Sequence, residues 1–307
     1  MIQIKPLVAI HCLVYNHEPY LRDCFEGFVM QQTNFPFVAI VHNDASTDDS
    51  AAIIREYEAK YPHIFKPIYQ TENLYSKRGF GAINDLIFAA IDQIGAKYIA
   101  MCEGDDYWTD PLKLQKQVDF MEENPECSLC FHKVNTLIQE TGEIKEEFIV
   151  RDVPGRSDII DLAKGNYIHT PSVLFRRSFL DLERYYKMMP CLPGDYVMWM
   201  LLAEKGFICK IDEPMAMYRH GSGIWSNNGG NNQSLQVLKT LSKLSCIIEN
   251  SEARAILNAN ILKLSTDMLD YISKVEKQYN QIRSSRAYRL GKFLLKPISL
   301  LRSIIKR

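Results

Sequence analysis

The chain has 307 residues, 47% of them hydrophobic, and a formal net charge of −1. This apolar fraction supports the core of one large domain, or of one domain with an appendage. No run approaches the ~20 apolar residues of a membrane-spanning helix. The first residues combine a single lysine with a short apolar run and lack a small-residue cleavage pattern, which favours a first strand over a signal peptide. We therefore expect a globular protein of the cytoplasm.

Eight cysteines lie mostly inside apolar runs, where cysteine behaves as a small hydrophobic residue. This placement favours a reducing compartment with unpaired thiols. Cys127 and Cys130 form a C-x-x-C pair. Because no second pair and no histidine at zinc-knuckle spacing accompany them, metal or redox chemistry there is not favoured.

Short apolar runs alternate with helical patterns along the first half of the chain. The runs are residues 7–14, 37–42, 63–69, 97–102 and 127–134. Repeated strand–helix alternation predicts an α/β fold with a mostly parallel, Rossmann-like central sheet and helices on both faces. Leu21, Phe25 and Phe28 recur at helical spacing and predict one of these helices.

A second helix is predicted around residues 114–121, with Asp110 as its N-cap and Pro111 as its first residue. Near residue 234 the pattern changes to helix without strands. We therefore expect one domain over residues 1–233 and an all-helical C-terminal region over residues 234–307.

Three carboxylates gather directly after the fourth predicted strand: Glu103, Asp105 and Asp106. In open α/β sheets, ligands bind at the carboxyl ends of the strands. Like charges so close together repel one another unless a cation or several donors compensate them. The cluster therefore predicts a metal-and-ligand site rather than an ordinary surface loop. A glycine-rich dinucleotide fingerprint and a P-loop are both missing from the sequence.

Three polar segments and a later pair can be taken together: VYNHEPYL, HNDASTDDS, CEGDDYWTDP, and CLPGDYVMWM with MYRHGSGIWS. In this order they resemble family 2 glycosyltransferases, the inverting enzymes of the GT-A fold. The resemblance covers roughly residues 6–230. It implies a GT-A domain that moves one sugar from a nucleoside-diphosphate sugar to a hydroxyl of a glycan or lipid-linked acceptor, in bacterial glycan assembly.

The resemblance places the acidic cluster at the diphosphate of the donor. Asp106 matches the carboxylate that holds a divalent cation, Mn²⁺ or Mg²⁺, and Asp105 matches the one near the ribose and the water shell of the metal. Glu103 stands where many relatives have aspartate. Hard carboxylate oxygens suit these cations, which stabilise charge on a leaving diphosphate. His220, before a Gly-Ser-Gly stretch, is a second candidate metal ligand, with a structural histidine as the alternative.

On the nucleotide side, the resemblance implies that Tyr15 and Asn16 lie over the nucleoside and that Asp44 recognises the base. Trp225 matches part of a lid over the donor. The alternative for Asp44 is a turn or cap before the helix expected near Asp48. The nucleotide itself, UDP, GDP or dTDP, stays open.

On the acceptor side, Asp195 matches the general base that takes the hydroxyl proton of the acceptor. The alternative for Asp195 is an ordinary N-cap of a helix over residues 196–204. Thr170 and Ser172 lie where the family places acceptor-side residues and are hydrogen-bonding candidates.

Two other functions compete with glycosyl transfer. A sugar-phosphate nucleotidyltransferase uses a similar sheet and metal carboxylates, but it usually has an early glycine- and lysine-rich phosphate loop, which this sequence lacks. A non-catalytic, membrane-docked assembly protein is expected to have lost Asp106 or Asp195, and the sequence has both.

The C-terminal tail, residues 283–307, carries eight basic residues and no acidic one, so residues 1–282 carry −9. Apolar residues are interleaved with this charge, which predicts segments that lie on an anionic membrane surface. We therefore expect peripheral attachment at the inner face of the plasma membrane. The alternative is packing on the protein's own core or on a second subunit of a homodimer. Nucleic acid is not expected as a partner, because the rest of the chain is acidic.

Overall fold

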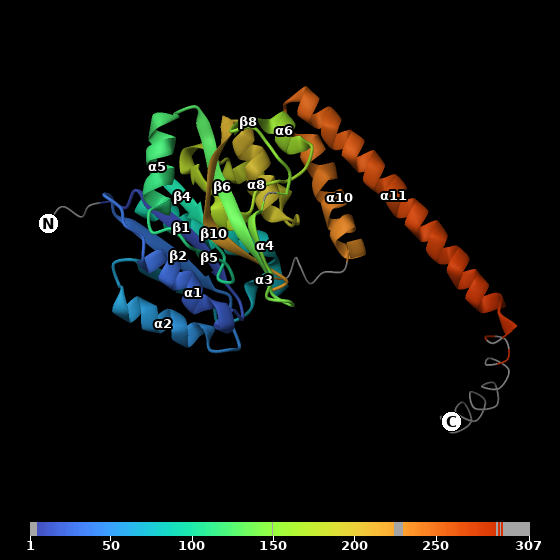
Figure 1. Ribbon diagram of the computed structural model, residues 1–307, viewed down its shortest axis with the longest axis horizontal. Coiled ribbons are helices and arrows are strands. Elements are labelled where there is room, and N and C mark those ends of the chain that lie inside the picture. Colours follow the sequence, from blue (N-terminus) through green and yellow to red (C-terminus); the bar gives the residue numbers. More distant parts are fainter. Residues whose placement is uncertain (1–4, 149, 224–229, 287, 289, 291–307) are drawn as a thin grey trace, which may run out of the picture. The chain divides into compact units, whose positions relative to one another are not determined.

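The computed structural model describes residues 5–148, 150–223, 230–286, 288 and 290 (Figure 1). The chain forms two compact units, Met1–Asn258 and Ala259–Arg307. The predicted boundary between residues 233 and 234 stays a prediction. Residues 291–307, which make up most of the basic tail, lie outside the described residues.

A single sheet runs through the first unit. Its strands lie in the order β3 (Phe65–Tyr69), β2 (Phe37–Asn43), β1 (Val8–Val14), β4 (Tyr98–Met101), β9 (Leu174–Arg176), β6 (Cys127–Ile138), β10 (Phe207–His220) and β5 (Tyr107–Trp108). Strands β7 (Ile144–Phe148) and β8 (Arg156–Ser157) pair with β6 and β10. The first four strands are parallel to one another, β9 is antiparallel to both of its neighbours, and β6 and β10 are parallel. The carboxyl ends of β1, β2 and β4 therefore meet at one edge.

Helices of the first unit flank this sheet (Figure 1). The helices before residue 204 are α1 (Glu18–Val29), α2 (Ser50–Lys60), α3 (Leu74–Arg78), α4 (Phe80–Ile94), α5 (Lys113–Glu123), α6 (Ile159–Ala163), α7 (Leu182–Met188) and α8 (Gly194–Ala203), with 3-10 turns η1 (Thr170–Ser172) and η2 (Arg177–Phe179). Helices α10 (Gly230–Ile247) and α11 (Ser251–Ser284) follow the last strand. The predicted apolar face of α1 is buried, and the ring centre of Phe25 lies 4.8 Å from that of Phe65 in β3. Burying such a side chain contributes ~1.5–3 kcal/mol.

The predicted α/β architecture is confirmed. All five predicted runs form strands, namely β1, β2, β3, β4 and β6, and helices follow residue 230. The sheet is mixed, because β9 and β5 enter it in the antiparallel sense. In the part of the chain that the structure describes, no helix combines the length and the apolar character that crossing a membrane requires.

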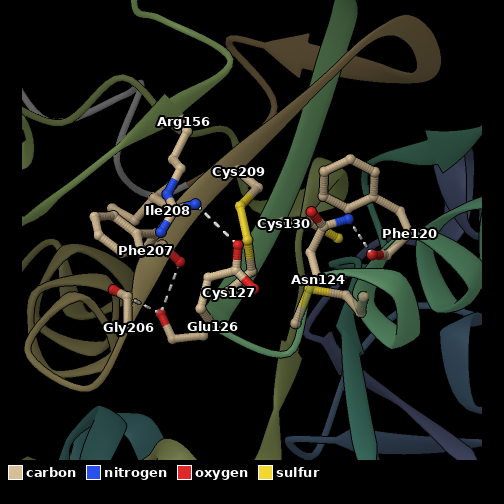
Figure 2. The surroundings of a disulfide bond; sticks show 12 residues. Phe120, Asn124, Glu126, Cys127, Cys130, Arg156, Gly206, Phe207, Ile208 and Cys209 are labelled. Carbon is tan, nitrogen blue, oxygen red and sulfur yellow. Dashed lines mark hydrogen bonds and ion pairs between the residues drawn. A yellow bond between two sulfur atoms is a disulfide. The ribbon is translucent and has the colours of Figure 1, made fainter.

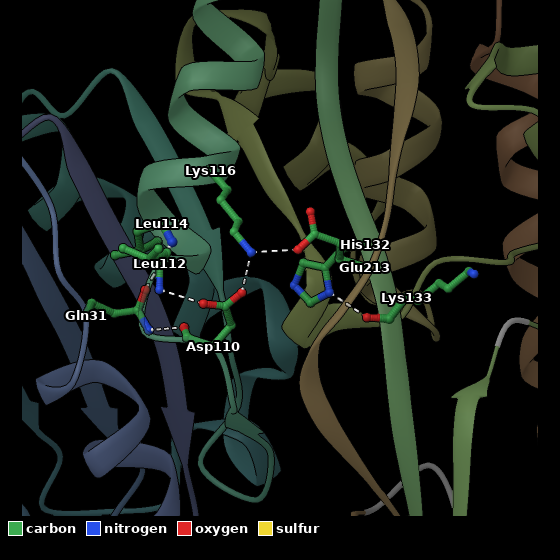
Figure 3. Close-up of polar contacts among 8 residues, drawn as sticks. All are labelled: Gln31, Asp110, Leu112, Leu114, Lys116, His132, Lys133 and Glu213. Carbon is green, nitrogen blue, oxygen red and sulfur yellow. Dashed lines mark hydrogen bonds and ion pairs between the residues drawn. The ribbon is translucent and has the colours of Figure 1, made fainter.

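The predicted cap of α5 is wrong. The helix begins at Lys113, with Leu112 at its N-cap position. Asp110 lies in the preceding turn, where Oδ1 accepts a hydrogen bond from the Leu112 N–H (2.7 Å) and Oδ2 one from the Lys116 ammonium (2.7 Å; Figure 3). Gln31 donates to the Asp110 carbonyl oxygen (2.9 Å). Asp-Pro pairs suit turns as well as caps, so the sequence pattern alone does not separate the two.

Two cysteines are joined, contrary to the expectation of unpaired thiols. Cys127 in β6 and Cys209 in β10 form a disulfide, with Cα atoms 6.3 Å apart (Figure 2). The two strands are parallel neighbours, which brings together residues that lie 82 positions apart in the sequence. Cys127 and Cys130 of the C-x-x-C sequence are not bonded to each other, and Cys130 is a buried free thiol.

Candidate active site

The acidic cluster lies between β4 and β5, at the edge where the parallel strands end. Gly104 lets the loop pass close to the start of α1, because a Cβ there would lie 2.8 Å from Nδ1 of His17 and 3.1 Å from a methyl group of Val14. Asp106 is buried, and its Oδ1 accepts a hydrogen bond from the Arg219 backbone N–H in β10 (2.7 Å). The end of β10 therefore fixes the carboxylate that is predicted to hold the metal.

Asp105 faces the segment that follows β10. Its Oδ2 accepts a hydrogen bond from the Ser222 hydroxyl (2.8 Å), and a Cβ on Gly223 would lie 3.3 Å from the same oxygen. The chain thus passes directly beside Asp105 after β10. Trp225, the predicted lid residue, lies outside the described residues.

Two carboxyl groups of this cluster, those of Glu103 and Asp106, are disfavoured in their charged form. Burial, followed by the charge of Asp105, raises the pKa of Asp106 well above its usual range. Burial raises the pKa of Glu103 to about 8, with smaller contributions from the charges of Asp105 and Asp195. Because a nearby positive charge favours the ionised form, a cation would compensate this cluster. Hard oxygen donors in this arrangement fit Mg²⁺ or Mn²⁺.

Protein side chains do not form a closed metal cage here. Among residues 5–148, 150–223 and 230–286, no three His, Cys, Asp or Glu side chains are arranged to hold an ion together. Mg²⁺ is typically bound by one or two carboxylates, and its shell is completed by water and substrate phosphates. His220, the last residue of β10, is exposed one position after Arg219.

Arg219 is a residue of this site that the sequence analysis did not single out. Its guanidinium lies between the rings of Tyr20 (5.1 Å to the ring centre) and Tyr107 (4.8 Å), and it pairs with Asp23. These contacts hold the end of β10 against α1 and the acidic loop. From sequence alone, this single arginine is indistinguishable from a surface arginine.

The two loops predicted to bind the nucleoside contact each other after β1 and β2. Asn16 has a left-handed backbone (φ 55°), which asparagine tolerates better than most residues. Its Oδ1 accepts a hydrogen bond from the Thr47 N–H (2.8 Å), and its own N–H donates to Oγ of Ser46 (3.0 Å). The neighbouring Tyr15 side chain is exposed (38%). Asn16 therefore connects the loops and leaves the Tyr15 ring at the surface.

Asp44 is buried and accepts hydrogen bonds from the start of a helix whose N-cap residue is Asn73, and this is not the helix that was expected. Its Oδ1 accepts a hydrogen bond from the Leu74 N–H (2.6 Å) and its Oδ2 one from the Tyr75 N–H (3.0 Å), at the start of α3. At the start of α2 it is Asp48 that accepts a hydrogen bond, from the Ser50 N–H (3.0 Å). Each carboxylate oxygen of Asp44 has a second lone pair, so capping leaves acceptor capacity for a nucleobase.

Asp195 lies in the first turn of α8, and Pro193 holds the N-cap position. The alternative of an N-cap at Asp195 is therefore wrong. Its Oδ1 accepts a hydrogen bond from the Tyr196 N–H (2.7 Å), and its Oδ2 accepts one from the hydroxyl of Thr170 (3.2 Å). Burial raises the pKa of Asp195, while these two hydrogen bonds act in the opposite direction.

The turn η1 connects Asp195 to the acidic loop. The Trp108 indole N–H donates to the Pro171 carbonyl oxygen (2.9 Å), and the Gln117 amide donates to that of Ser172 (2.8 Å). The Ser172 hydroxyl is buried and donates to the carbonyl oxygen of His169 (2.6 Å). Of the two acceptor-side candidates, Thr170 therefore contacts Asp195, whereas Ser172 stabilises the turn.

A buried polar chain approaches Asp195 from the interior of the domain. Nε2 of His11 lies 2.8 Å from Oδ1 of Asn84, and the Asn84 amide donates to the Tyr185 hydroxyl (2.8 Å). The charge of Asp195 contributes, after burial, to raising the pKa of Tyr185. The sequence analysis missed these residues because each lies inside an apolar or helical run, where a polar residue gives no separate signal.

The fold and the site define a family. The model described as "Glycosyl transferase family 2" matches residues 10–181, more than half of the chain, so the chain belongs to this family. It is 39% identical over 221 residues to an uncharacterized protein of Mycobacterium tuberculosis, covering 71% of this chain and 60% of that protein. It is 28% identical over 228 residues to the putative teichuronic acid biosynthesis glycosyltransferase TuaG of Bacillus subtilis, covering 73% of this chain and 83% of TuaG.

Two solved structures confirm the fold. Residues 1–349 of TarS from S. aureus, in complex with UDP-GlcNAc, align with a TM-score of 0.61 at 16% identity, over 84% of this chain and 72% of that one. The mannosyltransferase PcManGT from Pyrobaculum calidifontis, in complex with GDP-Man and Mn²⁺, aligns with a TM-score of 0.54 at 13% identity, over 95% and 84%. The chain thus has the fold of GT-A glycosyltransferases.

Proposed function

We propose that this protein is a metal-dependent, inverting glycosyltransferase that moves one sugar from a nucleoside-diphosphate sugar to a hydroxyl of a glycan or lipid-linked acceptor. The observation that carries this proposal is the connection made by η1. Thr170 contacts Asp195 at 3.2 Å, and the next residue, Pro171, is bonded to Trp108, two residues after Asp106. The candidate base and the candidate metal carboxylate therefore border one site.

The acidic loop is proposed to bind the donor diphosphate together with a divalent cation. Asp106 would hold the cation, with His220 as a second ligand, and Asp105 would lie near the ribose and the water shell of the metal. When bound, the cation stabilises negative charge on the leaving diphosphate. Burial of Asp106 keeps this site at low dielectric, where charge interactions are stronger than in water. The Mn²⁺ in the PcManGT complex supports this choice of cofactor.

Asp195 is proposed to act as the general base. The acceptor hydroxyl oxygen forms a bond to the anomeric carbon, and the bond from that carbon to the diphosphate breaks. The hydroxyl proton moves to the carboxylate of Asp195, and the nucleoside diphosphate leaves with the electron pair. Thr170 donates to Oδ2 of Asp195, which keeps the carboxylate oriented for this transfer. A single displacement of this kind inverts the anomeric centre.

The nucleoside is proposed to bind against the loops after β1 and β2. The exposed Tyr15 ring would cover it, Asn16 would hold the loop and Asp44 would accept a hydrogen bond from the base. Glu103 would be a further residue of the nucleotide-sugar site. The titles of the two solved structures name UDP-GlcNAc and GDP-Man, which supports a nucleotide-sugar donor without selecting one base.

The acceptor is proposed to belong to cell-surface polysaccharide assembly at the inner face of the plasma membrane. The name of the relative TuaG, which refers to teichuronic acid, supports this direction. The basic tail, residues 283–307, would attach the protein to anionic lipid at the surface where a lipid-linked acceptor is found.

A panel of donors tests the proposal. Full-length protein with Mn²⁺ is incubated with UDP-, GDP- and dTDP-sugars, and both the melting temperature and the release of nucleoside diphosphate are measured. We expect one nucleotide class to raise the melting temperature, because a ligand that binds only the folded state stabilises it. The same class should be turned over. Stabilisation by none of the three, or turnover that is unchanged in EDTA, would contradict the proposal.

A further inference from the structure

The last helix, α11, exposes large apolar side chains along much of its length. Leu262 is 70% exposed, Leu269 66%, Tyr279 56% and Ile282 61%. Single exposed apolar residues are ordinary on a protein surface, but a contiguous apolar stripe marks an interaction surface. The spacing of the apolar residues along the whole of α11 indicates what kind of surface they form.

Apolar positions on α11 repeat with a period of seven residues. They are Ile261, Met268, Ile272, Val275, Tyr279 and Ile282, with Ser265 completing the series. Successive members are alternately four and three residues apart, a mean of 3.5 residues. This is the period of the a and d positions of a left-handed coiled coil, in which each seam residue inserts between side chains of a facing helix. We call residues 261–282 with this pattern the α11 seam.

The two sides of α11 differ sharply in character. Leu262, Leu264, Leu269 and Tyr271 flank the α11 seam and widen it. The opposite face is entirely polar and consists of Lys263, Thr266, Asp267, Asp270, Ser273, Lys274, Lys277, Asn280, Gln281 and Ser284. An apolar stripe opposite an entirely polar face is typical of a helix that packs against another helix.

We propose that the α11 seam forms a parallel coiled coil with the same helix of a second copy of this chain. In a parallel pair each a or d residue faces its own counterpart, so Ile272 packs on Ile272 and Val275 on Val275. The flanking pairs of that arrangement join Leu264 to Leu269, Tyr271 to Glu276 and Gln278 to Arg283, and none brings like charges together. A second copy thus matches the α11 seam in apolar spacing and in charge.

The charge of this helix segment separates the proposal from membrane binding. Residues 259–284 carry four basic and three acidic side chains, which are Lys263, Lys274, Lys277 and Arg283 against Asp267, Asp270 and Glu276. A helix that lies on anionic lipid carries a strongly basic polar face. The α11 seam is therefore assigned to a protein partner, and the lipid surface to the basic tail that follows it.

Mass measurement tests this assignment. We expect full-length protein to sediment as a dimer at tens of micromolar and to dissociate on dilution, since only about three heptads contribute. Ile272→Glu places a charge in the α11 seam and should give a monomer. Ser273→Glu makes the same change in charge one residue away, on the polar face, and should remain a dimer. A monomeric wild type, or equal masses for the two variants, would overturn the proposal.

Crosslinking tests the parallel arrangement. In a Cys246→Ser background, which removes the exposed native thiol, Val275→Cys is close in size to the original residue and faces its counterpart across the pair. Oxidation should join it into a covalent dimer, whereas Ser273→Cys on the outer face should stay monomeric on a non-reducing gel. If the wild type is a dimer but the Val275→Cys and Ser273→Cys variants crosslink equally, or neither of them crosslinks, the parallel pairing is overturned. If the α11 seam instead packs on the protein's own core, the wild type should be a monomer, and Ile272→Glu should lower its melting temperature. That result would also overturn the proposal.

Discussion

The hydroxyl of Thr170 donates a hydrogen bond to Oδ2 of Asp195 over 3.2 Å, although the two residues belong to different elements, η1 and α8. Sequence resemblance suggested each residue separately, one for the acceptor side and one as the base. Because the two side chains are in contact, we infer that they act together and have different roles that can be tested. Asp195 would take the proton, and Thr170 would set the orientation and the proton affinity of the carboxylate.

Asp195→Asn tests the base. Asparagine keeps the size of the side chain, and its oxygen can accept from the Tyr196 N–H while its amide donates to the Thr170 hydroxyl, but it cannot take a proton. We expect donor affinity to change little and turnover to fall by about 10² or more, the usual scale for removing a general base. Steady-state kinetics with the donor chosen from the panel, together with nucleotide titration, check this. Weakened nucleotide binding with normal turnover would remove Asp195 from the base role.

Thr170→Val tests the orienting contact through pH dependence. Burial raises the pKa of Asp195, and the Thr170 hydrogen bond lowers it, since that bond favours the charged form. Asp195 acts as a base only when it is ionised, so turnover should rise with pH around the pKa of Asp195, which lies above the ordinary aspartate value. Removing the Thr170 hydroxyl should move this rising limb of the pH profile to still higher pH. At neutral pH we expect a loss of roughly fivefold, about 1 kcal/mol.

Ser172→Ala is the matched control for Thr170→Val. Its hydroxyl bonds to the carbonyl oxygen of His169 (2.6 Å) and does not reach Asp195 through any contact in the described structure. The pH limb should therefore stay at the wild-type position. A limb that moves equally in both variants, or that moves to lower pH in Thr170→Val, would show that the hydroxyl does not act on Asp195.

Asp106→Asn tests the cation. Loss of one ligand charge should reduce turnover by on the order of 10³-fold or more, because a Lewis acid contributes several kcal/mol. Without metal, the variant should melt no lower than wild type, since it removes charge from a cluster in which burial and Asp105 raise the pKa of Asp106. The rise in melting temperature on adding Mn²⁺ with nucleotide should be lost. Full activity of the variant, or of wild type in EDTA, would contradict the role of Asp106.

Asp44→Ala tests reading of the base against helix capping. Loss of the bonds to Leu74 and Tyr75 should lower stability by about 1 kcal/mol, the typical effect of deleting a cap. If Asp44 also binds the nucleobase, nucleotide affinity should fall by more than the loss of folding stability explains. Asp48→Ala is the control, because Asp48 accepts the Ser50 and Glu18 N–H groups in the same loop region. Equal losses of nucleotide affinity in both variants would assign Asp44 to loop structure alone.

The sequence predicted the parts of this fold that depend on local pattern. Apolar runs located β1, β2, β4 and β6, and the carboxylates after Met101 fell at the edge that their parallel order creates. Contacts between distant segments were not predicted. The Arg219 backbone N–H reaches Asp106 from 113 residues away, and no sequence pattern encodes a bond made by a main-chain atom.

The same limit explains the errors. Asp44 caps α3, a five-residue helix too short to leave a periodic signal, so capping was assigned to the next helix in the sequence. Cys127 and Cys209 meet because β6 and β10 are neighbours, which depends on the order of strands in the sheet and not on either strand's sequence. Local pattern thus located the candidate residues, whereas their partners depended on topology.

Removing residues 283–307 tests the membrane role of the tail. A variant ending at Ile282 keeps the α11 seam, so it should remain a dimer like the wild type while losing the basic charge of the tail. We expect full-length protein to pellet with anionic vesicles at low salt and to be released partly at high salt, because attraction to lipid headgroups is screened beyond a Debye length of ~10 Å at 0.1 M. The shortened variant should stay in solution and still bind nucleotide.

Two full-length variants separate the contributions of charge and of apolar contact. Changing Lys292, Lys296, Arg302 and Lys306 to glutamine should strongly reduce the salt-sensitive part of vesicle binding, since each basic residue near such a surface contributes about 1 kcal/mol. Changing Leu294, Leu295, Leu301 and Ile304 to serine should weaken binding at every salt concentration, because it removes the side chains that enter the interface. Neutral vesicles serve as the reference surface for both. Vesicle binding that survives removal of residues 283–307 undiminished would exclude the tail as the anchor and place the contact on another surface of the protein.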